Sequence, residues 1–332
     1  MTAARTLADL GWSAFFADQR RPEEATLLPQ RVATVHRARM SALSETGAVK
    51  LMLPVHANTG DYAVGDWVLV EPGTQMLRRR LDRRTVLERR REGSSRPQLA
   101  AANVDALFIV TSCNADFNPT RLERYLALAN QGGAEPVIVL TKADVAEDAE
   151  RYRREAEALQ RDLAVALVNP REPEAAACLG PWCGPGRTVA VVGSSGVGKS
   201  TLVNALAGPD HAAPQATGSI RQYDAKGRHT TTSRSLHAIA GGGWVIDTPG
   251  IRSLQLGDAA EGIDTLFAEI TELAPECRFR DCTHAHEPGC AVQGAVAEGR
   301  LDPERVARWH VLRAENRGNT VVPTGPRGNK RR

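Results

Sequence analysis

Alternating apolar and polar positions mark the first third of this 332-residue chain as β-rich. Short strand-like runs, among them "RVATVHRA" and "YAVGDWVLVE", follow one another with turn-forming residues such as Gly60 and Gly73 between some of them. Runs of this kind are typical of a small sandwich or barrel. We therefore expect an OB-like β-barrel over residues 31–96. Residues 1–30 show little regular pattern, and we expect an N-terminal extension there.

A strand–helix–strand rhythm begins near Asn103. Four apolar runs predict buried strands, namely "VDALFIVTS", "PVIVL", "AVALV" and "TVAVVG". The helix expected at "PTRLERYLALANQGG" places Leu122, Tyr125 and Leu126 on one face and ends at two glycines. A charged helix over about 146–163 and strands at "SLHAI" and "GWVID" complete the pattern. Alternating strands and helices predict a mostly parallel sheet covered on both faces, and we assign 97–256 to this α/β domain.

The rest of the chain is expected to form a helical domain over residues 257–317. Residues 262–275 carry apolar positions at helical spacing, and a cysteine-rich loop follows them. The segment "DPERVARWHVLRAEN" predicts a helix with Asp302 as its N-cap and Pro303 in its first position. Residues 318–332 are basic and rich in glycine and proline, which favours a flexible tail.

The net charge of +3 hides an uneven distribution. Residues 1–100 contain 16 Lys and Arg against 11 Asp and Glu, and residues 301–332 contain 8 against 3. Residues 101–300 contain 18 against 25, so two basic ends flank an acidic middle. This distribution favours contact with a polyanion, with a solvated charged surface as the alternative. We expect phosphate contacts from the arginine-rich stretch between Arg78 and Arg96.

The lengths of the apolar runs also indicate the cellular location of the protein. None of them approaches the roughly 20 residues that cross a bilayer. The first residues, "MTAARTLADLGWSAFF", contain an early acid and no small-residue cleavage site, which argues against a signal peptide. We therefore expect a cytoplasmic protein with no membrane partner, and a monomer.

The segment "GSSGVGKST" matches the phosphate-binding pattern G-x-x-x-x-G-K-[ST] in full, with a strand expected before it and a helix after it. Glycines let the backbone curl around a phosphate with its N–H groups pointing inward, and the helix N-terminus adds a favourable field. Lys199 is expected to reach the β- and γ-phosphates, and Ser200 to bind Mg²⁺. The nucleotide-binding residues expected from this motif are Gly193, Ser194, Ser195, Gly196, Val197, Gly198, Lys199, Ser200 and Thr201.

Two further motifs point to GTP, GDP and Mg²⁺ as ligands. "DTPG" directly follows the strand expected at "GWVI", so Asp247 stands at the strand's carboxyl end facing the Mg²⁺ site, and Gly250 can offer its N–H to the γ-phosphate. A GTPase also needs a switch threonine that binds Mg²⁺ and senses the γ-phosphate. The segment "GRHTTTS" offers Thr231, with Thr230 and Thr232 as alternatives.

The tetrapeptide "TKAD" follows an apolar run but precedes the phosphate loop in the chain, the reverse of the usual GTPase order. Ligands of parallel α/β sheets bind outside the carboxyl ends of the strands, so the site requires spatial proximity and not chain order. We therefore place Thr141, Lys142 and Asp144 in the same pocket as Lys199. Asp144 would accept hydrogen bonds from the ring N–H and amino group of guanine, and the Lys142 stem would pack on the base.

Three thiols and an imidazole occur within fourteen residues near the C-terminus. Cys277, Cys282, His284 and Cys290 form a ligand set that suits one tetrahedral, structural Zn²⁺. His286 is the alternative to His284. The remaining cysteines have no matching second pair and are interpreted as structural or incidental: Cys113, Cys178 and Cys183.

In this order, the motifs "VGDWV", "AANVD", "LTKAD", "GSSGVGKST", "GRHTTT", "DTPG" and the Cys-Cys-His-Cys series resemble the circularly permuted GTPases, most closely the RsgA (YjeQ) family of small-ribosomal-subunit biogenesis GTPases. The resemblance runs from about Arg31 to Asn316. It implies an OB barrel, a permuted GTPase domain and a zinc-containing C-terminal domain. It also implies a role in late 30S maturation, with the 30S subunit and its 16S rRNA as partners and GTP hydrolysis stimulated by the small subunit.

Three positions depart from common GTPase patterns. Thr141 stands where many GTPases have Asn, and it should still allow a hydrogen bond across the loops. The usual Ser-Ala base-contacting loop corresponds to Val168-Asn169-Pro170, so its assignment near Asn169 stays open. Ile251 replaces the water-orienting glutamine of Ras-like enzymes, and an apolar side chain cannot orient water. His229 is then the nearest candidate for positioning the water, with an ordinary surface histidine as the alternative.

The sequence thus predicts a GTPase in which Lys199, Thr231 and His229 carry catalysis. The alternatives are a non-ribosomal GTP-dependent regulator that binds another RNA or a protein, and an ATP-using kinase.

Overall fold

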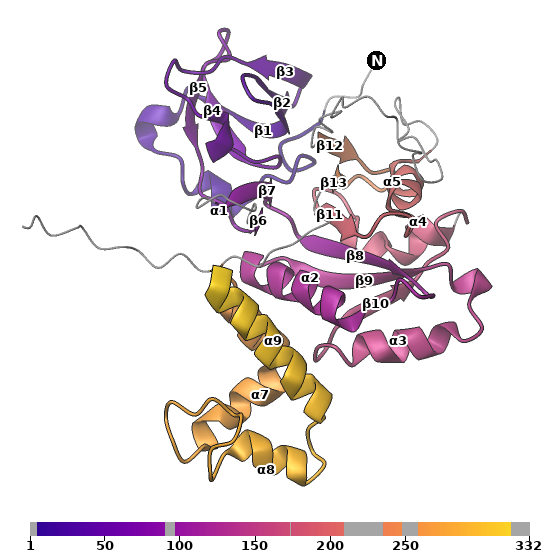
Figure 1. Cartoon of the computed structure of the whole chain (residues 1–332). Helices are drawn as coiled ribbons and strands as arrows, with labels where there is room; N and C mark the ends of the chain where they lie inside the picture. Colours follow the sequence, from indigo (N-terminus) through magenta and orange to yellow (C-terminus); the bar gives the residue numbers. More distant parts are fainter. Residues whose placement is uncertain (1–4, 90–96, 173, 209–234, 248–257, 320–332) are drawn as a thin grey trace, which may run out of the picture.

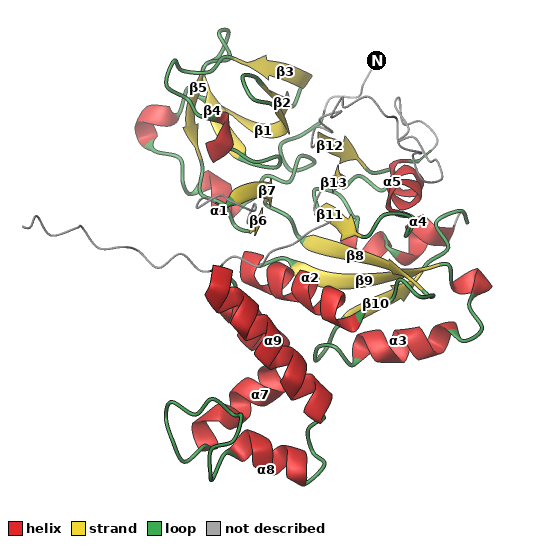
Figure 2. Ribbon diagram, viewed as in Figure 1, coloured by secondary structure: helices red, strands yellow, loops and turns green. Residues whose placement is uncertain are grey.

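The computed structural model describes residues 5–89, 97–172, 174–208, 235–247 and 258–319. Figure 1 shows three parts along the chain: a barrel-like group of strands, a central sheet with helices, and a group of C-terminal helices. In Figure 2 the strands lie in the first two parts, and the third part contains only helices and loops. Among the described residues, none of the helices combines the length and apolar character needed to cross a bilayer.

Five strands form a closed ring in the first part. β1 pairs with both β2 and β4, β2 pairs with β3, and β4 pairs with β5. A bridge between Met52 and Met76 joins β3 to β5 and completes the order 1-2-3-5-4-1. The predicted OB-like barrel is therefore confirmed. The elements of this part are α1 (Ala14–Ala17), a 3-10 turn (Pro22–Glu24), β1 (Leu28–Val35), β2 (Met40–Ser44), β3 (Gly47–Leu51), a 3-10 turn (Thr59–Asp61), β4 (Trp67–Val70) and β5 (Leu77–Arg80).

Residues 5–27, which belong to the expected N-terminal extension, pack against the barrel. Phe16 is 2% exposed, and the ring centroids of Trp12 and Phe16 lie 4.8 and 5.8 Å from that of Trp67. The segment is anchored by single aromatic side chains and not by a regular apolar face. A search for hydrophobic periodicity therefore finds no signal in it.

Within the described part of the chain, six strands form the central sheet in the order β10-β9-β8-β11-β13-β12. The first five run parallel, and β12 is antiparallel to β13, which agrees with the mostly parallel sheet predicted. β12 also pairs with β1, so the central sheet continues into the barrel. The elements between the barrel and the C-terminal part are β6 (Val86–Arg89), β7 (Gln98–Ala102), β8 (Ala106–Ser112), α2 (Pro119–Gly132), β9 (Glu135–Thr141), a 3-10 turn (Ala143–Val145), α3 (Ala149–Glu157), β10 (Ala164–Leu167), α4 (Glu174–Cys178), a 3-10 turn (Gly180–Trp182), β11 (Thr188–Gly193), α5 (Lys199–Ala207), β12 (Ser235–Ala238) and β13 (Trp244–Asp247).

Apolar side chains cover both faces of this sheet. Successive residues of a strand point to opposite faces. Phe108 of β8 belongs to a core shared with Leu202 of α5, whereas its neighbours Leu107 and Ile109 belong to a core shared with Leu126 of α2. The parallel strands are therefore buried on both sides, as their continuous apolar runs predict.

The C-terminal part differs from the expected pair of helices. The helix predicted over 262–275 is interrupted at Phe267, whose backbone leaves the helical region at φ −111° and ψ 45°. The short α8 has no clear periodic signal in the sequence. The charged helix predicted over 146–163 is also shorter, as α3. The C-terminal elements are α6 (Ala260–Leu266), α7 (Ala268–Leu273), a 3-10 turn (Ala274–Glu276), α8 (Ala291–Ala297) and α9 (Pro303–Asn319).

Candidate nucleotide and metal sites

The carboxyl ends of four parallel strands meet at one edge of the central sheet. Thr141 at the end of β9 lies opposite Ser112 of β8, and Gly193 at the end of β11 lies opposite Val110 of the same strand. Asp247 at the end of β13 lies opposite Val191 of β11. The strand ends from which these loops leave therefore lie side by side although their order in the chain is unusual. This is where ligands of open α/β sheets bind.

The phosphate loop has the backbone that its glycines permit. Gly193, Gly196 and Gly198 have φ values of 138°, 82° and 95°, which side chains rarely tolerate. A Cβ on Gly193 would lie 2.1 Å from the carbonyl oxygen of Val110, so the loop starts in close contact with β8. The Lys199 ammonium donates to the carbonyl oxygen of Ser194 across the loop. The loop thus closes on itself at the N-terminus of α5.

Thr141 connects the T-K-A-D loop to the phosphate loop. Its hydroxyl oxygen lies 2.7 Å from the carbonyl oxygen of Val197 and 3.1 Å from that of Thr111, and the residue is 1% exposed. A buried hydroxyl needs such partners, because an unpaired one costs free energy. The hydrogen bond across the loops that we expected from Thr141 is therefore confirmed.

Lys142 and Asp144 lie on the same connection. Lys142 has φ 57° and is partly exposed, and Asp144 is exposed in the 3-10 turn that follows β9. The segment after β10 also reaches this edge, because Pro170 Cγ would lie 3.8 Å from a Cβ on Gly198. Asn169 donates to Glu172 at 2.8 Å, and its contact with a base stays a prediction.

The described residues hold part of the predicted nucleotide and Mg²⁺ site. Ser200 and Asp247 are partly exposed at the same sheet edge as Lys199. The expected His229, Thr231 and Gly250 lie outside the described residues, as do Thr230, Thr232 and Ile251.

The four predicted zinc ligands come together. Their ligand atoms all lie within 4.8 Å of one another, although the residues are spread over a loop and the start of α8. His284 Nδ1 lies 3.4 Å from Cys277 Sγ and 3.5 Å from Cys290 Sγ, and these two sulfurs are 3.9 Å apart. Burial lowers the pKa of the His284 imidazole, which favours the neutral form that binds metal. A Cys₃His set of this size fits a structural Zn²⁺.

Groups around the cluster orient its ligands. Backbone N–H groups of Ala291 and Gln293 donate to the sulfurs of Cys277 and Cys290, both at 3.4 Å. Such partners stabilise thiolates and hold them in place. His286 is exposed and outside the cluster, which leaves His284 as the imidazole ligand.

Glu287 was missed by the sequence analysis, although it stands within "THAHEPGC". Its carboxylate accepts from the backbone N–H and the hydroxyl of Thr283 and from the N–H groups of Ala285 and His286. These hydrogen bonds, those from Thr283 first, hold the pKa of Glu287 far below its usual range. The charged carboxylate therefore fixes the turn that carries Cys282 and His284.

Cys113 and Cys183 are buried, and burial raises the pKa of their thiols to about 11 and about 12. Cys178 is exposed. None of the three joins the cluster of ligand atoms found among the described residues, which agrees with a structural or incidental role.

Several arginines of the arginine-rich stretch form ion pairs within the protein. Four of its described arginines hold ion pairs within the fold: Arg78 with Glu71, Arg79 with Glu24, Arg83 with Asp66 and Arg84 with Asp105. Arg78 and Arg84 stay about half exposed beside their partners, and the phosphate contacts expected from this stretch stay a prediction. The remaining arginines between 90 and 96 lie outside the described residues.

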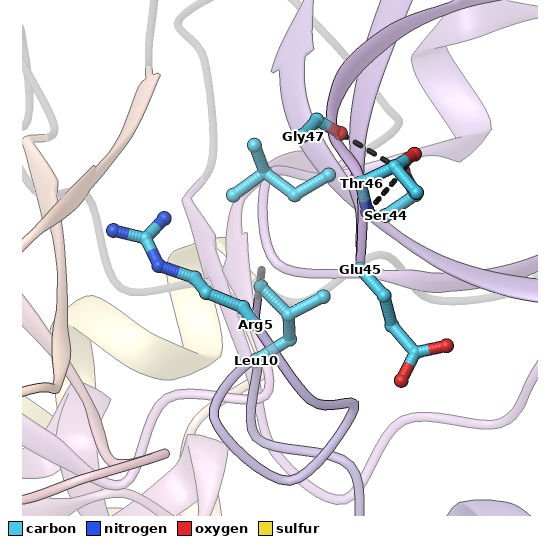
Figure 3. A pocket seen from close by; sticks show the side chains of 7 residues that line it. Arg5, Leu10, Ser44, Glu45, Thr46 and Gly47 are labelled. Atoms are coloured by element: carbon cyan, nitrogen blue, oxygen red, sulfur yellow. Dashed lines mark hydrogen bonds between the residues drawn. The ribbon is translucent and has the colours of Figure 1, made fainter. Parts of the chain in front are cut away.

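Figure 3 shows a small pocket at the seam between the N-terminal segment and the β2–β3 turn. None of its lining residues belongs to the phosphate loop or the T-K-A-D loop, so we do not assign it to the nucleotide. The lining residues are Arg5, Leu10, Leu43, Ser44, Glu45, Thr46 and Gly47.

A phosphate loop joined to a preceding T-K-A-D loop, between an OB-like barrel and a Cys₃His helical part, defines a circularly permuted P-loop GTPase fold. A sequence model described as RsgA GTPase matches residues 80–257. The chain belongs to the RsgA GTPase family.

Relatives and solved structures agree with this assignment. A protein of Mesorhizobium japonicum named small ribosomal subunit biogenesis GTPase RsgA is 69% identical over 98% of this chain and 94% of its own length. Its counterpart named RsgA 2 in Vibrio vulnificus is 47% identical over 95% of this chain and 89% of its own.

The crystal structure of YjeQ from Thermotoga maritima matches with a TM-score of 0.66 and 25% identity over 88% of this chain and 99% of that one. The structure of YloQ, described as a circularly permuted GTPase, shares the fold with a TM-score of 0.64 and 23% identity over 90% and 98%.

Proposed function

We propose that this protein is a GTPase of late 30S subunit maturation, which binds the subunit and hydrolyses GTP to GDP and phosphate in order to leave it. The observation that carries the proposal is the near-complete coverage of a relative with that name at 69% identity. The hydrogen bond between Thr141 and the phosphate loop supports it, because a guanine-reading loop would then lie beside the phosphates. We further propose that it works as a monomer in the cytoplasm.

The chemistry would be in-line attack of water on the γ-phosphorus. Lys199 would offset charge that develops on the phosphate oxygens, and the N–H groups of residues 193–201 would cradle the phosphates. Ser200, Asp247 and Thr231 would hold Mg²⁺, which supplies further charge neutralisation when bound. Because position 251 cannot orient water, His229 would position the nucleophile.

Cys277, Cys282, His284 and Cys290 would hold one structural Zn²⁺. All four positions of a tetrahedral ion would be filled by protein, which leaves no place for a substrate. The His284 ring also lies 5.4 Å from the ring of Trp309 on α9. The ion would therefore stabilise the packing of the cysteine-rich loop against that helix.

The barrel would contact 16S rRNA through a further surface besides the arginine-rich stretch. The loop between strands 1 and 2 of OB barrels commonly meets oligonucleotides. In this chain it carries Arg37 and Arg39, both exposed, and Lys50 is exposed on the neighbouring β3. These cations would supply the salt-dependent phosphate contacts.

The decisive experiment measures GTP turnover by the purified protein with and without 30S and 50S subunits. We expect stimulation by the 30S subunit only. A protein stimulated by neither subunit would support the alternative of a non-ribosomal GTP-dependent regulator. Competition against labelled GDP tests the kinase alternative in the same preparation. ATP should displace the bound GDP only if the nucleotide site accepts adenine.

Asp144→Asn tests the reading of the base. The substitution replaces an acceptor by a donor opposite guanine, so GTP affinity should fall and preference should move toward xanthine nucleotides. Equilibrium binding of GDP and XDP measures both effects. Unchanged GTP affinity would remove the T-K-A-D loop from the site.

His229→Ala tests the positioning of the water. Nucleotide and 30S affinity should persist, while stimulated turnover should fall by ~10²–10⁴-fold, the usual value of one positioned catalytic group. Normal stimulated rates would shift the search to groups supplied by ribosomal RNA.

A further inference from the structure

Strand β1 belongs to the barrel but contacts the GTPase sheet at two points. Thr34 of β1 lies opposite Ser235 of β12, and the Arg31 side chain reaches Thr188, the first residue of β11. In Figure 1 the barrel accordingly stands beside the β12 edge of the central sheet. A single strand of the barrel therefore pairs with one strand of the GTPase sheet and contacts a second through a side chain.

The first contact continues as a row across the sheet. Thr34 lies opposite Ser235, Ser235 lies opposite Asp247, and Asp247 lies opposite Val191. Asp247 is the residue expected to face Mg²⁺, and Val191 stands two residues before Gly193. Four paired strands thus join the barrel backbone to the strand ends that carry the nucleotide-binding residues.

The second contact is a buried guanidinium. Arg31 is 1% exposed, and it donates to Leu10 O at 2.7 Å, Thr188 Oγ1 at 2.7 Å and Asn103 O at 3.3 Å. These acceptors come from the N-terminal segment, from β11 and from the residue that follows β7. One side chain therefore holds together three separate parts of the chain.

The hydrogen-bond acceptors of the Arg31 guanidinium are neutral oxygens, and the Trp67 ring centroid lies 6.0 Å from its Cζ, so burying this charge is costly. Among the described residues Arg31 forms no ion pair, and its buried Nε has no hydrogen-bond partner. Burial lowers the pKa of Arg31 to about 10, so the group stays charged at neutral pH. An apolar side chain of similar size would avoid the desolvation cost. The arrangement therefore favours a defined orientation of the parts over maximal stability.

The partners of Arg31 are themselves held in place. Asp105 accepts from the backbone N–H of Thr188 at 2.7 Å and is paired with Arg84 of the barrel side. The N-terminal segment is fixed to β13 as well, because Trp244 Nε1 donates to Asp9 O at 2.7 Å. The contact is therefore a connected network and not an isolated hydrogen bond.

We propose that Arg31 is a positioning residue that couples the barrel to the nucleotide site. With the guanidinium in place, a displacement of β1 moves the start of β11 and the β12–β13 pair together. Without it, the β1–β12 pair remains as a connection, and the start of β11 no longer follows β1 when the barrel binds its partner. The coupling to turnover rests on the proposed 30S-stimulated hydrolysis, whereas the mechanical connection does not.

Arg31→Met and Thr188→Val test the coupling from its two ends. Stimulation by 30S should fall by about 5- to 150-fold, the range of typical coupling free energies, while GDP affinity, intrinsic turnover and 30S affinity stay at wild-type values. Arg31→Lys should rescue little, because an ammonium cannot span the forked set of acceptors. The double variant should lose no more than the larger single loss, because both ends belong to one contact.

Arg20→Met is the matched control. Arg20 also donates only to neutral carbonyl oxygens, those of Glu24, Ala25 and Leu27, but all of them lie within seven residues on the barrel side. Its loss should affect stability without changing the stimulation factor. Equal uncoupling by Arg20→Met would mean that any loosening of the barrel suffices, and would overturn the role of Arg31.

Hydrogen exchange provides a readout that needs no ribosome. Arg31→Met should raise exchange in residues 5–12 and at the start of β11, and leave β8 and β9 protected. Wild-type exchange in a folded Arg31→Met protein would overturn the proposal, as would a parallel loss of GDP binding and stimulated turnover. If Arg31→Met does not fold, Thr188→Val and Arg31→Lys carry the same comparison. A wild-type protein without 30S stimulation would refute the proposed function. The exchange data would still show whether Arg31 holds the N-terminal segment and the start of β11 together.

Discussion

Two buried arginines stand at the two junctions of the GTPase domain, and their partners differ. Arg31, at the junction with the barrel, is held by carbonyl and hydroxyl oxygens. Arg305, at the junction with the C-terminal helices, is held by the carboxylates of Glu123 on α2 and Glu269 on α7, at 2.8 and 2.7 Å. The first charge is buried without a paired opposite charge, and the second is neutralised in place.

The second junction is also held by further polar contacts. Glu123 is fully buried and accepts from both Arg305 and Arg308 at 2.8 Å. The Arg305 guanidinium lies 4.0 Å from the ring centroid of Phe267, and its Nη2 donates to Leu266 O at 2.7 Å. The C-terminal helices are thus attached rigidly to α2. The difference indicates that the two junctions have different roles. The first is suited to transmit movement of the barrel to the GTPase domain, and the second to prevent movement of the C-terminal helices.

Metal removal should give the largest effect and should separate the junctions. Binding of structural zinc contributes ~10–16 kcal/mol in small zinc domains at neutral pH, so Cys282→Ser or chelation should unfold residues 277–290 and loosen α9. Hydrogen exchange should rise there and stay unchanged in residues 5–12, and GDP should still bind. Protein prepared without chelators that contains no metal would refute the zinc assignment.

Arg305→Met should be the next most damaging change. It removes one of the two arginines that neutralise the buried Glu123 carboxylate. Breaking a buried ion pair typically costs about 3–5 kcal/mol. Exchange in α9 and α6 measures the loss. Arg313→Met is the control, because the Arg313–Asp264 pair is more than a third exposed at both ends and should contribute about 1 kcal/mol or less. Equal losses in the two variants would contradict the contrast.

Glycines at the two junctions allow a matched comparison of packing. A Cβ on Gly65 would lie 2.1 Å from Ala102 O, and one on Gly262 would lie 2.1 Å from Ala127 O. Each alanine variant should cost about 1–3 kcal/mol through overpacking. Gly65→Ala should cost more, because its φ of 95° adds about 1–2 kcal/mol of backbone strain.

Gly47→Ala measures the cost of backbone strain without a steric clash. Gly47 has φ 121°, and no atom lies within 4 Å of the added Cβ. Denaturant unfolding, followed by exchange at each junction, measures the three variants. Gly47→Ala as costly as Gly65→Ala would show that contact with Ala102 is unimportant.

Mild acid should give the smallest of these effects at the barrel, where it acts through Glu24. The hydrogen bond from Arg79, above all, lowers the pKa of Glu24 from its ordinary value of 4.5. A carboxyl with a lowered pKa stabilises the fold above its unfolded pKa, and this stability is lost as the pH falls below 4.5 through the folded value. Exchange in residues 19–27 should therefore rise below pH 4.5, by the equivalent of about 1 kcal/mol. Glu24→Gln should show this loosening already at pH 7 and no further acid step.

Local patterns carried much of what could be predicted. The strand expected at "TVAVVG" coincides with β11, because buried parallel strands are continuously apolar. The helix expected at "PTRLERYLALANQGG" has the bounds of α2, because Asn118 caps its start and Gly133, at φ 73°, ends it. The metal ligands were recognisable because their residue types and spacing are set by the ion.

Only the tertiary structure decided which charged side chains are exposed to solvent and which form ion pairs within the protein. The sequence contains several arginines in and near the barrel and does not distinguish Arg79, which is paired with Glu24, from Arg37, which is exposed. Arg31 meets Thr188, which is 157 positions away in the chain, only because β1 pairs with β12 and the N-terminal segment folds back. Periodicity reports the environment of a residue averaged over its own element. The partner of a buried charge depends on how distant elements dock, and no local pattern contains that information.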